Sequence, residues 1–140
     1  MPTQIFVNLP VKDLEKSKDF FRTFGFGFDP KFTDEKAACM VVSEAIYVML
    51  LEESFFQTFT NKPVCDATQA TEAIMCLSMD SREAVDDRVA RAVQAGATAP
   101  LAPRDFGFMY QNGFQDPEGH VWELVHLSGP APVEGAGAPS

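Results

Sequence analysis

The fold is decided by residues 4–25, which have the sequence QIFVNLPVKDLEKSKDFFRTFG. Residues 4–9 alternate between the two faces of a predicted strand, and Pro10 is expected to end the pairing of that strand. Asp13 is the expected N-cap of a helix, because its carboxylate can accept from the unpaired amides of the first turn. Apolar residues recur at helical spacing up to Gly25, a residue typical of the position after a helix. The stretch therefore predicts a strand followed by an amphipathic helix.

The same order of elements occurs again further along the chain. Strand-like residues 73–79 precede a capping signal at residues 80–83, and a second apolar stripe ends at Gly96. Three short strands are expected after each helix, at 26–28, 38–42 and 46–51, and then at 97–99, 106–114 and 120–127. A repeated unit of this kind predicts an α+β fold of two tandem βαβββ modules, at approximately 4–60 and 72–127. We expect the modules to form a curved mixed sheet, an incomplete barrel that encloses a small-molecule pocket, with the helices outside.

Composition limits the classes of partner. The 140 residues suffice for one domain, expected at 1–127, whereas residues 128–140 are rich in Gly, Pro and Ala and are predicted to be a disordered tail. The net charge is −9 and the basic residues are scattered, which disfavours nucleic acid and anionic membranes. No apolar run approaches the roughly 20 residues of a membrane span. Without a recognisable leader and with three cysteines that lack metal-type spacing, a cytoplasmic location is expected.

Two motifs resemble those of a known superfamily. Residues 7–17, VNLPVKDLEKS, followed by FF at 20–21 and FGF at 24–26, resemble the opening module of the vicinal oxygen chelate superfamily. Residues 114–124, FQDPEGHVWEL, resemble its closing hairpin. The superfamily includes glyoxalase I, extradiol dioxygenases, and the fosfomycin- and bleomycin-resistance proteins. Residues 33–40, 47–51 and 107–110 are similar to a bacterial branch of predicted lactoylglutathione lyases. The resemblance implies the fold but leaves the activity open, because this scaffold hosts binding proteins and several chemistries.

The resemblance also implies four positions for metal ligands. They align with Phe6, with Ile74, with Tyr47 or Met49, and with Glu123. Only Glu123 has a carboxylate, whereas divalent metal sites normally need three or more oxygen or nitrogen ligands. We therefore expect no metal and no cofactor, and a divalent metal is the alternative. The two imidazoles, His120 and His126, are expected on the strand face opposite Glu123.

Glu123 is the candidate catalytic residue. It is expected to face an apolar cavity, where an unpaired carboxylate is unfavourable unless it binds a ligand or its pKa rises. It is therefore a candidate for ligand recognition or for a general base, and the alternative is an inherited residue that Asn8, Tyr110 or water satisfies. Gly107 and Gly113 bracket a segment that is expected to move as a lid or to contain a bulge. The expected ligand-binding residues are Phe6, Asn8, Met49, Ile74, Cys76, Tyr110 and Glu123.

Three functions remain open. The leading hypothesis is a binding module whose aromatic-lined cleft holds a small organic molecule without a conventional metal site. The rival is a metal-dependent, glyoxalase I-like lyase or isomerase, which would need cationic partners for the carboxylates of glutathione, and the predicted pocket strands contain no Arg or Lys. The third hypothesis is an oligomeric structural protein without a ligand. A homodimer is expected, since members of the superfamily often pair their modules.

Overall fold

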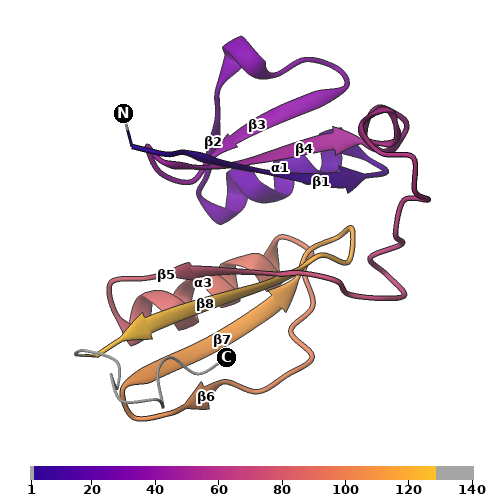
Figure 1. The fold of residues 1–140 in the computed structure, drawn as a ribbon. Helices are drawn as coiled ribbons and strands as arrows, with labels where there is room; N and C mark the ends of the chain where they lie inside the picture. Colours follow the sequence, from indigo (N-terminus) through magenta and orange to yellow (C-terminus); the bar gives the residue numbers. More distant parts are fainter. Residues whose placement is uncertain (1, 129–140) are drawn as a thin grey trace. The chain divides into compact units, whose positions relative to one another are not determined.

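The chain is represented by a computed structural model that describes residues 2–128. Its contacts divide it into two compact units (Figure 1). The first runs to Ala70 and also includes Pro117–Gly119, whereas the second comprises Thr71–Asp116 and continues from His120. Residues 129–140, which contain most of the tail predicted to be disordered, lie outside the described residues.

The first unit is a mixed sheet with a helix on one side (Figure 1). The strand order is β1-β4-β3-β2, in which β1 is parallel to β4 and the other pairs are antiparallel. Its elements are β1 (Ile5–Val11), α1 (Leu14–Phe24), β2 (Gly27–Phe28), the 3-10 turn η1 (Pro30–Phe32), β3 (Ala37–Val41), β4 (Ile46–Glu52), α2 (Glu53–Phe56) and the 3-10 turn η2 (Gln57–Phe59).

Local signals at both ends of α1 act as the sequence predicts. The side chain of Asp13 accepts from the amide of Lys16 at 3.0 Å, which satisfies a donor of the first turn. Gly25 adopts φ 124°, and its amide donates to the carbonyl of Phe21 at 3.0 Å. A side chain is strained at this positive φ, so glycine ends the helix here.

The second unit repeats this order (Figure 1). Its elements are β5 (Ile74–Ser78), α3 (Arg82–Gln94), β6 (Arg104–Asp105), β7 (Met109–Gln115) and β8 (Val121–Leu127), with strand order β5-β8-β7-β6. Strand β5 is parallel to β8, and the other pairs are antiparallel. Helix α3 is capped by Ser81, whose side chain accepts from the amide of Ala84 at 3.0 Å.

The core of the second unit is built around Trp122, the one tryptophan of the chain. Its side chain is fully buried and stacks with Phe114, with 6.4 Å between ring centroids. Its indole Nε1 donates to Oδ2 of Asp116 at 3.0 Å. Asp116 also accepts from the amide of His120 at 3.0 Å, so this buried carboxylate joins the end of β7 to the start of β8.

The predicted α+β fold of two βαβββ modules is confirmed, and each module forms its own four-stranded sheet. The closure of both sheets around one pocket stays a prediction. The strand expected at 97–99 is wrong: only an isolated bridge joins Thr98 to Gln115, and the edge strand is β6. Pro100 and Pro103, which have no amide hydrogen to donate, separate these two pairings.

Strand β7 begins at Met109 rather than at the predicted Phe106. Gly107 turns the chain at φ 87°, and the amide of Phe106 donates to the carbonyl of Met109 at 2.8 Å. None of the helices within residues 2–128 has the length and apolar character that crossing a membrane requires.

Candidate functional site

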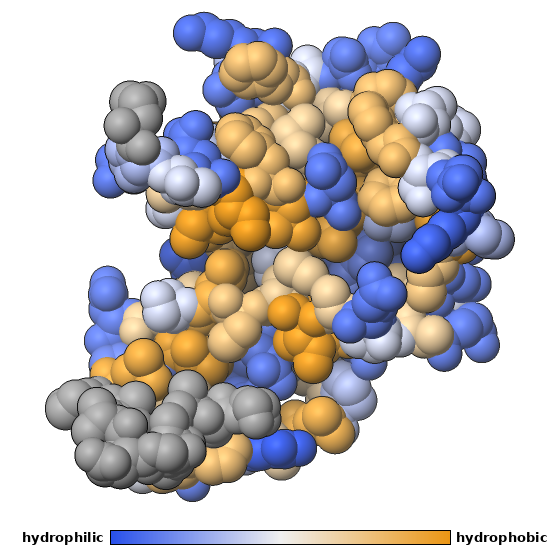
Figure 2. Space-filling model, viewed as in Figure 1, coloured by the Kyte–Doolittle hydropathy of each residue, from blue (hydrophilic) through white to orange (hydrophobic). Residues whose placement is uncertain are grey.

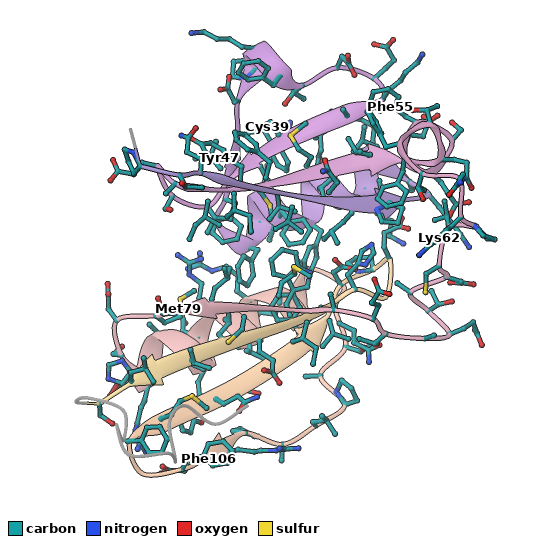
Figure 3. All side chains as sticks on the ribbon, in the orientation of Figure 1. Cys39, Tyr47, Phe55, Lys62, Met79 and Phe106 are labelled. Atoms are coloured by element: carbon teal, nitrogen blue, oxygen red, sulfur yellow. The ribbon has the colours of Figure 1, made fainter. Side chains whose placement is uncertain are left out.

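The sheet of the first unit has an aromatic pair on the face opposite its buried Val48 and Leu50. Phe6 of β1 and Tyr47 of β4 are register partners, and their rings stack with 4.7 Å between centroids. Asn8 pairs with Met49 in the same register, so the predicted residues Phe6, Asn8 and Met49 share one face. Phe6 is 48% exposed, in keeping with the apolar residues visible at the surface in Figure 2. Figure 3 labels Tyr47 on this sheet.

The sheet of the second unit brings other predicted residues together. Glu123 of β8 pairs with Cys76 of β5, and Ile74 lies two residues away on the same face. Cys76 is exposed, but desolvation by neighbouring groups raises the pKa of its thiol, and the negative charge of Glu123 raises it further. The predicted group of Ile74, Cys76 and Glu123 therefore exists within this unit.

Tyr110 lies apart from that group. It pairs with His126, and both side chains belong to the face opposite Glu123. The hydroxyl of Tyr110 donates to Asp86 of α3 at 2.8 Å, and this hydrogen bond raises the pKa of the tyrosine. Nδ1 of His126 lies 3.1 Å from the carbonyl oxygen of Met79. The alternative in which Tyr110 satisfies Glu123 is therefore wrong, because Tyr110 bonds to a helix on the other side of the sheet.

Gly113 makes room for the side chain of Glu123. The two are register partners on adjacent strands. A Cβ atom on Gly113 would lie 2.8 Å from the backbone oxygen of Trp122 and 3.5 Å from Cγ of Glu123. Pairing between β7 and β8 is continuous from Met109 to Gln115, so the described structure has no bulge there. Glycine at position 113 therefore permits the close approach of the strands rather than a bulge, and movement of the bracketed segment as a lid stays a prediction.

A cavity of about 70 Å³ lies beside Gly113 and Glu123 of the second sheet, and we call it the second-module pocket. Segment 100–104 forms one side, and strands β7 and β8 supply the rest. All of its lining residues belong to the second unit. They are Pro100, Leu101, Ala102, Arg104, Gln111, Asn112, Gly113, Phe114, Gln115, Val121, Trp122 and Glu123.

Of the predicted ligand-binding residues, only Glu123 lines this pocket. Sequence reasoning missed Gln111 and Gln115, although their alternation with Gly113 opposite Glu123 is a signal that could have identified them. It also missed Arg104, which corrects the expectation that the pocket strands contain no basic residue. A strand of two residues after a proline gives no periodic signal, so the sequence did not reveal Arg104.

Hydrogen bonds on the opposite face hold β6 in place. Arg82 of α3 donates to both carboxylate oxygens of Asp105, at 2.7 and 3.0 Å. The amide of Gly107 also donates to Asp105 at 2.8 Å, and these hydrogen bonds lower the pKa of the aspartate. Because successive strand residues point to opposite faces, anchoring Asp105 beside α3 directs Arg104 to the pocket face.

The residues at the four implied metal-ligand positions do not fit a hard divalent ion. Phe6 and Ile74 are hydrocarbons and Met49 is a thioether, which leaves the carboxylate of Glu123 as the one hard donor. Tyr47, the alternative third position, uses its hydroxyl to donate to the carbonyl of Glu44 at 3.1 Å. Within residues 2–128, no three His, Cys, Asp or Glu side chains are grouped so as to hold a metal.

Comparisons with known proteins agree with this architecture. A family model described as bleomycin resistance protein-like N-terminal matches residues 3–43. No curated protein sequence gives a significant match. Among solved structures, hypothetical protein SA1046 from S. aureus is 26% identical with a TM-score of 0.77, over 91% of this chain and 95% of that one.

Two further solved structures carry more informative names. A glyoxalase/bleomycin resistance protein/dioxygenase family enzyme from Burkholderia phytofirmans PsJN is 20% identical with a TM-score of 0.74, over 90% of this chain and 99% of that one. TnmS3, an antibiotic binding protein from Streptomyces sp. CB03234, is 23% identical with a TM-score of 0.66, over 91% and 98%. The chain has the fold of these proteins. The lactoylglutathione lyase branch stays a prediction.

Proposed function

We propose that this protein binds a small organic molecule in the second-module pocket, without a metal ion. The observation that carries the proposal is the position of Glu123 in the lining of that pocket. No described residue donates a hydrogen bond to its carboxylate or pairs with it, although a carboxylate in a hollow is favourable only when it is solvated or bound. Because Glu123 is partly exposed, a ligand with a hydrogen-bond donor can reach this carboxylate and replace the solvent around it.

The rest of the lining is suited to a partly apolar ligand. Leu101 is 66% exposed at the pocket, and Pro100 and Val121 add further apolar surface. Apolar walls with a few polar groups are the usual composition of small-molecule sites. The names of the similar proteins support this class of ligand, since one structural neighbour is an antibiotic binding protein and the matching family model is bleomycin resistance protein-like.

The test is a thermal-shift screen of a broad panel of small antibiotics and metabolites, because a cavity of about 70 Å³ admits only a small molecule or one end of a larger one. A ligand at 100 times its Kd stabilises the folded state by about 2.7 kcal/mol, so a genuine ligand raises the unfolding temperature measurably. We expect at least one responder whose shift is reduced by Glu123→Gln. Glu35→Gln is the matched control, because Glu35 is exposed and outside the pocket. A panel without responders refutes the proposal and favours a structural protein.

The rival lyase is checked with the same protein. We expect no turnover of methylglyoxal with glutathione when zinc or nickel is added, because the implied ligand positions supply only one hard donor. Stoichiometric metal together with turnover that Glu123→Gln abolishes contradicts the binding function. The homodimer and the cytoplasmic location also stay predictions, and sedimentation checks the dimer.

A further inference from the structure

The two charged side chains that line the second-module pocket have opposite signs. Arg104 and Glu123 are the one basic and the one acidic residue in the lining. Within the described part of the chain, neither side chain takes part in a hydrogen bond or an ion pair. The side chains of Gln111 and Gln115, which lie on the same face, also have no described partner.

The opposite face of the same sheet is different. Two of its polar side chains bond to α3: Tyr110 and Asn112 both donate to Asp86, the latter at 3.1 Å. Arg82 pairs with Asp105 and lies over the ring of Tyr110, 5.1 Å from its centroid. On the other face, Arg104 is exposed and Gln111, Gln115 and Glu123 are partly exposed, and none of these side chains has a partner within the described residues. These four side chains are therefore accessible to an external partner.

The sheet register sets the distance between the two charges. Arg104 on β6 pairs with Gln111 on β7, whereas Glu123 on β8 pairs with Gly113. The two Cα atoms are therefore two strand spacings apart across the sheet and two residues apart along it. With about 4.8 Å between strands and about 3.3 Å per residue, they are separated by roughly 12 Å. Both side chains can lean inward, so one small molecule can contact both.

From this arrangement, and on the basis of the proposed function, we infer the class of ligand. We propose that the second-module pocket binds a small molecule with two polar ends, an acid group held by Arg104 and an amine or other donor held by Glu123. Arg104 is suited to the acid because its planar guanidinium can donate two hydrogen bonds to one carboxylate or phosphate. Gln111 lies beside Arg104 and adds both a donor and an acceptor between the ends.

The test uses simple probes that separate the two ends. 6-Aminohexanoate and 8-aminooctanoate carry both groups, whereas hexanoate carries only the acid and hexylamine only the amine. Affinities are measured by amide chemical-shift titration at 0.15 M salt, which screens the general field of a chain with net charge −9. The variants are Arg104→Gln and Glu123→Gln, and the controls are Lys62→Gln and Glu35→Gln, both outside the pocket. Unchanged urea unfolding verifies that each variant is folded.

We expect the better aminoalkanoate to bind about tenfold more tightly than either single-ended probe, equivalent to about 1.4 kcal/mol. Arg104→Gln should remove the gain in affinity that the acid group confers and leave the affinity for hexylamine unchanged. Glu123→Gln should remove the gain that the amine confers and leave the affinity for hexanoate unchanged. Aminoalkanoates that bind no better than hexanoate or hexylamine overturn the inference. If a panel compound perturbs the pocket amides while no aminoalkanoate does, only this inference fails. If neither does, the proposed function fails with it.

Discussion

Replacement of Gly113 by alanine tests the close approach of strands that makes room for Glu123. A Cβ atom at this position would lie 2.8 Å from the backbone oxygen of Trp122, well inside an ordinary van der Waals contact. The obstructing atom is backbone in a paired strand, so it cannot rotate away as a side chain would. Gly27 provides a matched control, because it also lies in a strand and a Cβ there meets nothing within 4 Å.

The expected magnitude follows from two contributions. Alanine stabilises either position by about 0.4–1 kcal/mol, because it restricts the unfolded chain more than glycine does. Overpacking at Gly113 destabilises the folded state by about 1–3 kcal/mol. The first contribution is shared by both variants and cancels in their difference. Gly113→Ala should therefore have a free energy of unfolding about 1–3 kcal/mol below that of Gly27→Ala.

Urea unfolding measures this difference. Trp122 is buried in the second unit and its fluorescence reports on that unit, whereas far-UV circular dichroism reports on the whole chain. The two probes together detect separate unfolding of the units, which a single probe would miss. Equal unfolding midpoints for Gly113→Ala and Gly27→Ala would refute the steric argument, and with it the register that places Glu123 opposite a glycine.

Three further predictions concern other contacts of the structure. Asp116→Ala removes the acceptor for the Trp122 indole and the His120 amide, so the free energy of unfolding should fall by about 2–3 kcal/mol. Urea unfolding measures this change, and an unchanged midpoint contradicts the buried network. Glu118→Ala removes the carboxylate that accepts from the amides of Lys12 and Asp13, at 2.8 and 2.9 Å, and should lower stability by about 1 kcal/mol, whereas Glu35→Ala should not. Equal effects of these two substitutions argue against that contact. Glu123→Gln should lower the pKa of the Cys76 thiol, because the charge that raises this pKa is removed. More thiolate is then present at a given pH, so alkylation of Cys76 should begin at a lower pH. Peptide mass spectrometry measures the alkylation, with Cys65, which is also exposed, as the reference. An unchanged pH profile for Cys76 contradicts the proximity of Cys76 and Glu123.

The fold was predictable where short-range signals agree with the hydrophobic pattern. Helix α1 illustrates this, because Asp13 and Gly25 mark its ends and the phenylalanines between them face the core. The two-module organisation followed from recurrence of the same order of elements, which requires no knowledge of long-range contacts. The resemblance to the superfamily groups Glu123 with Ile74 and Cys76 as pocket residues, and in the structure Glu123 pairs with Cys76 in the ladder of β5 and β8.

The candidate site was less predictable because it depends on pairing between distant residues. Tyr110 was assigned to the pocket although it lies one residue out of phase with Gln111, and a shift of one residue reverses the face of a strand. Arg104 belongs to a strand of only two residues, whose position is fixed by the pair between Arg82 and Asp105, 23 residues apart in sequence. No local pattern encodes such a contact.

The binding of a ligand in the second-module pocket is tested most directly by mapping amide chemical shifts during titration with the panel compound that stabilises the protein most. We expect the perturbed amides to be those of Leu101, Ala102 and Arg104 and of residues 111–115 and 121–123, and we expect Glu123→Gln to weaken the binding without moving this cluster. Perturbations that lie outside these segments, or an affinity that Glu123→Gln leaves unchanged, would contradict this expectation.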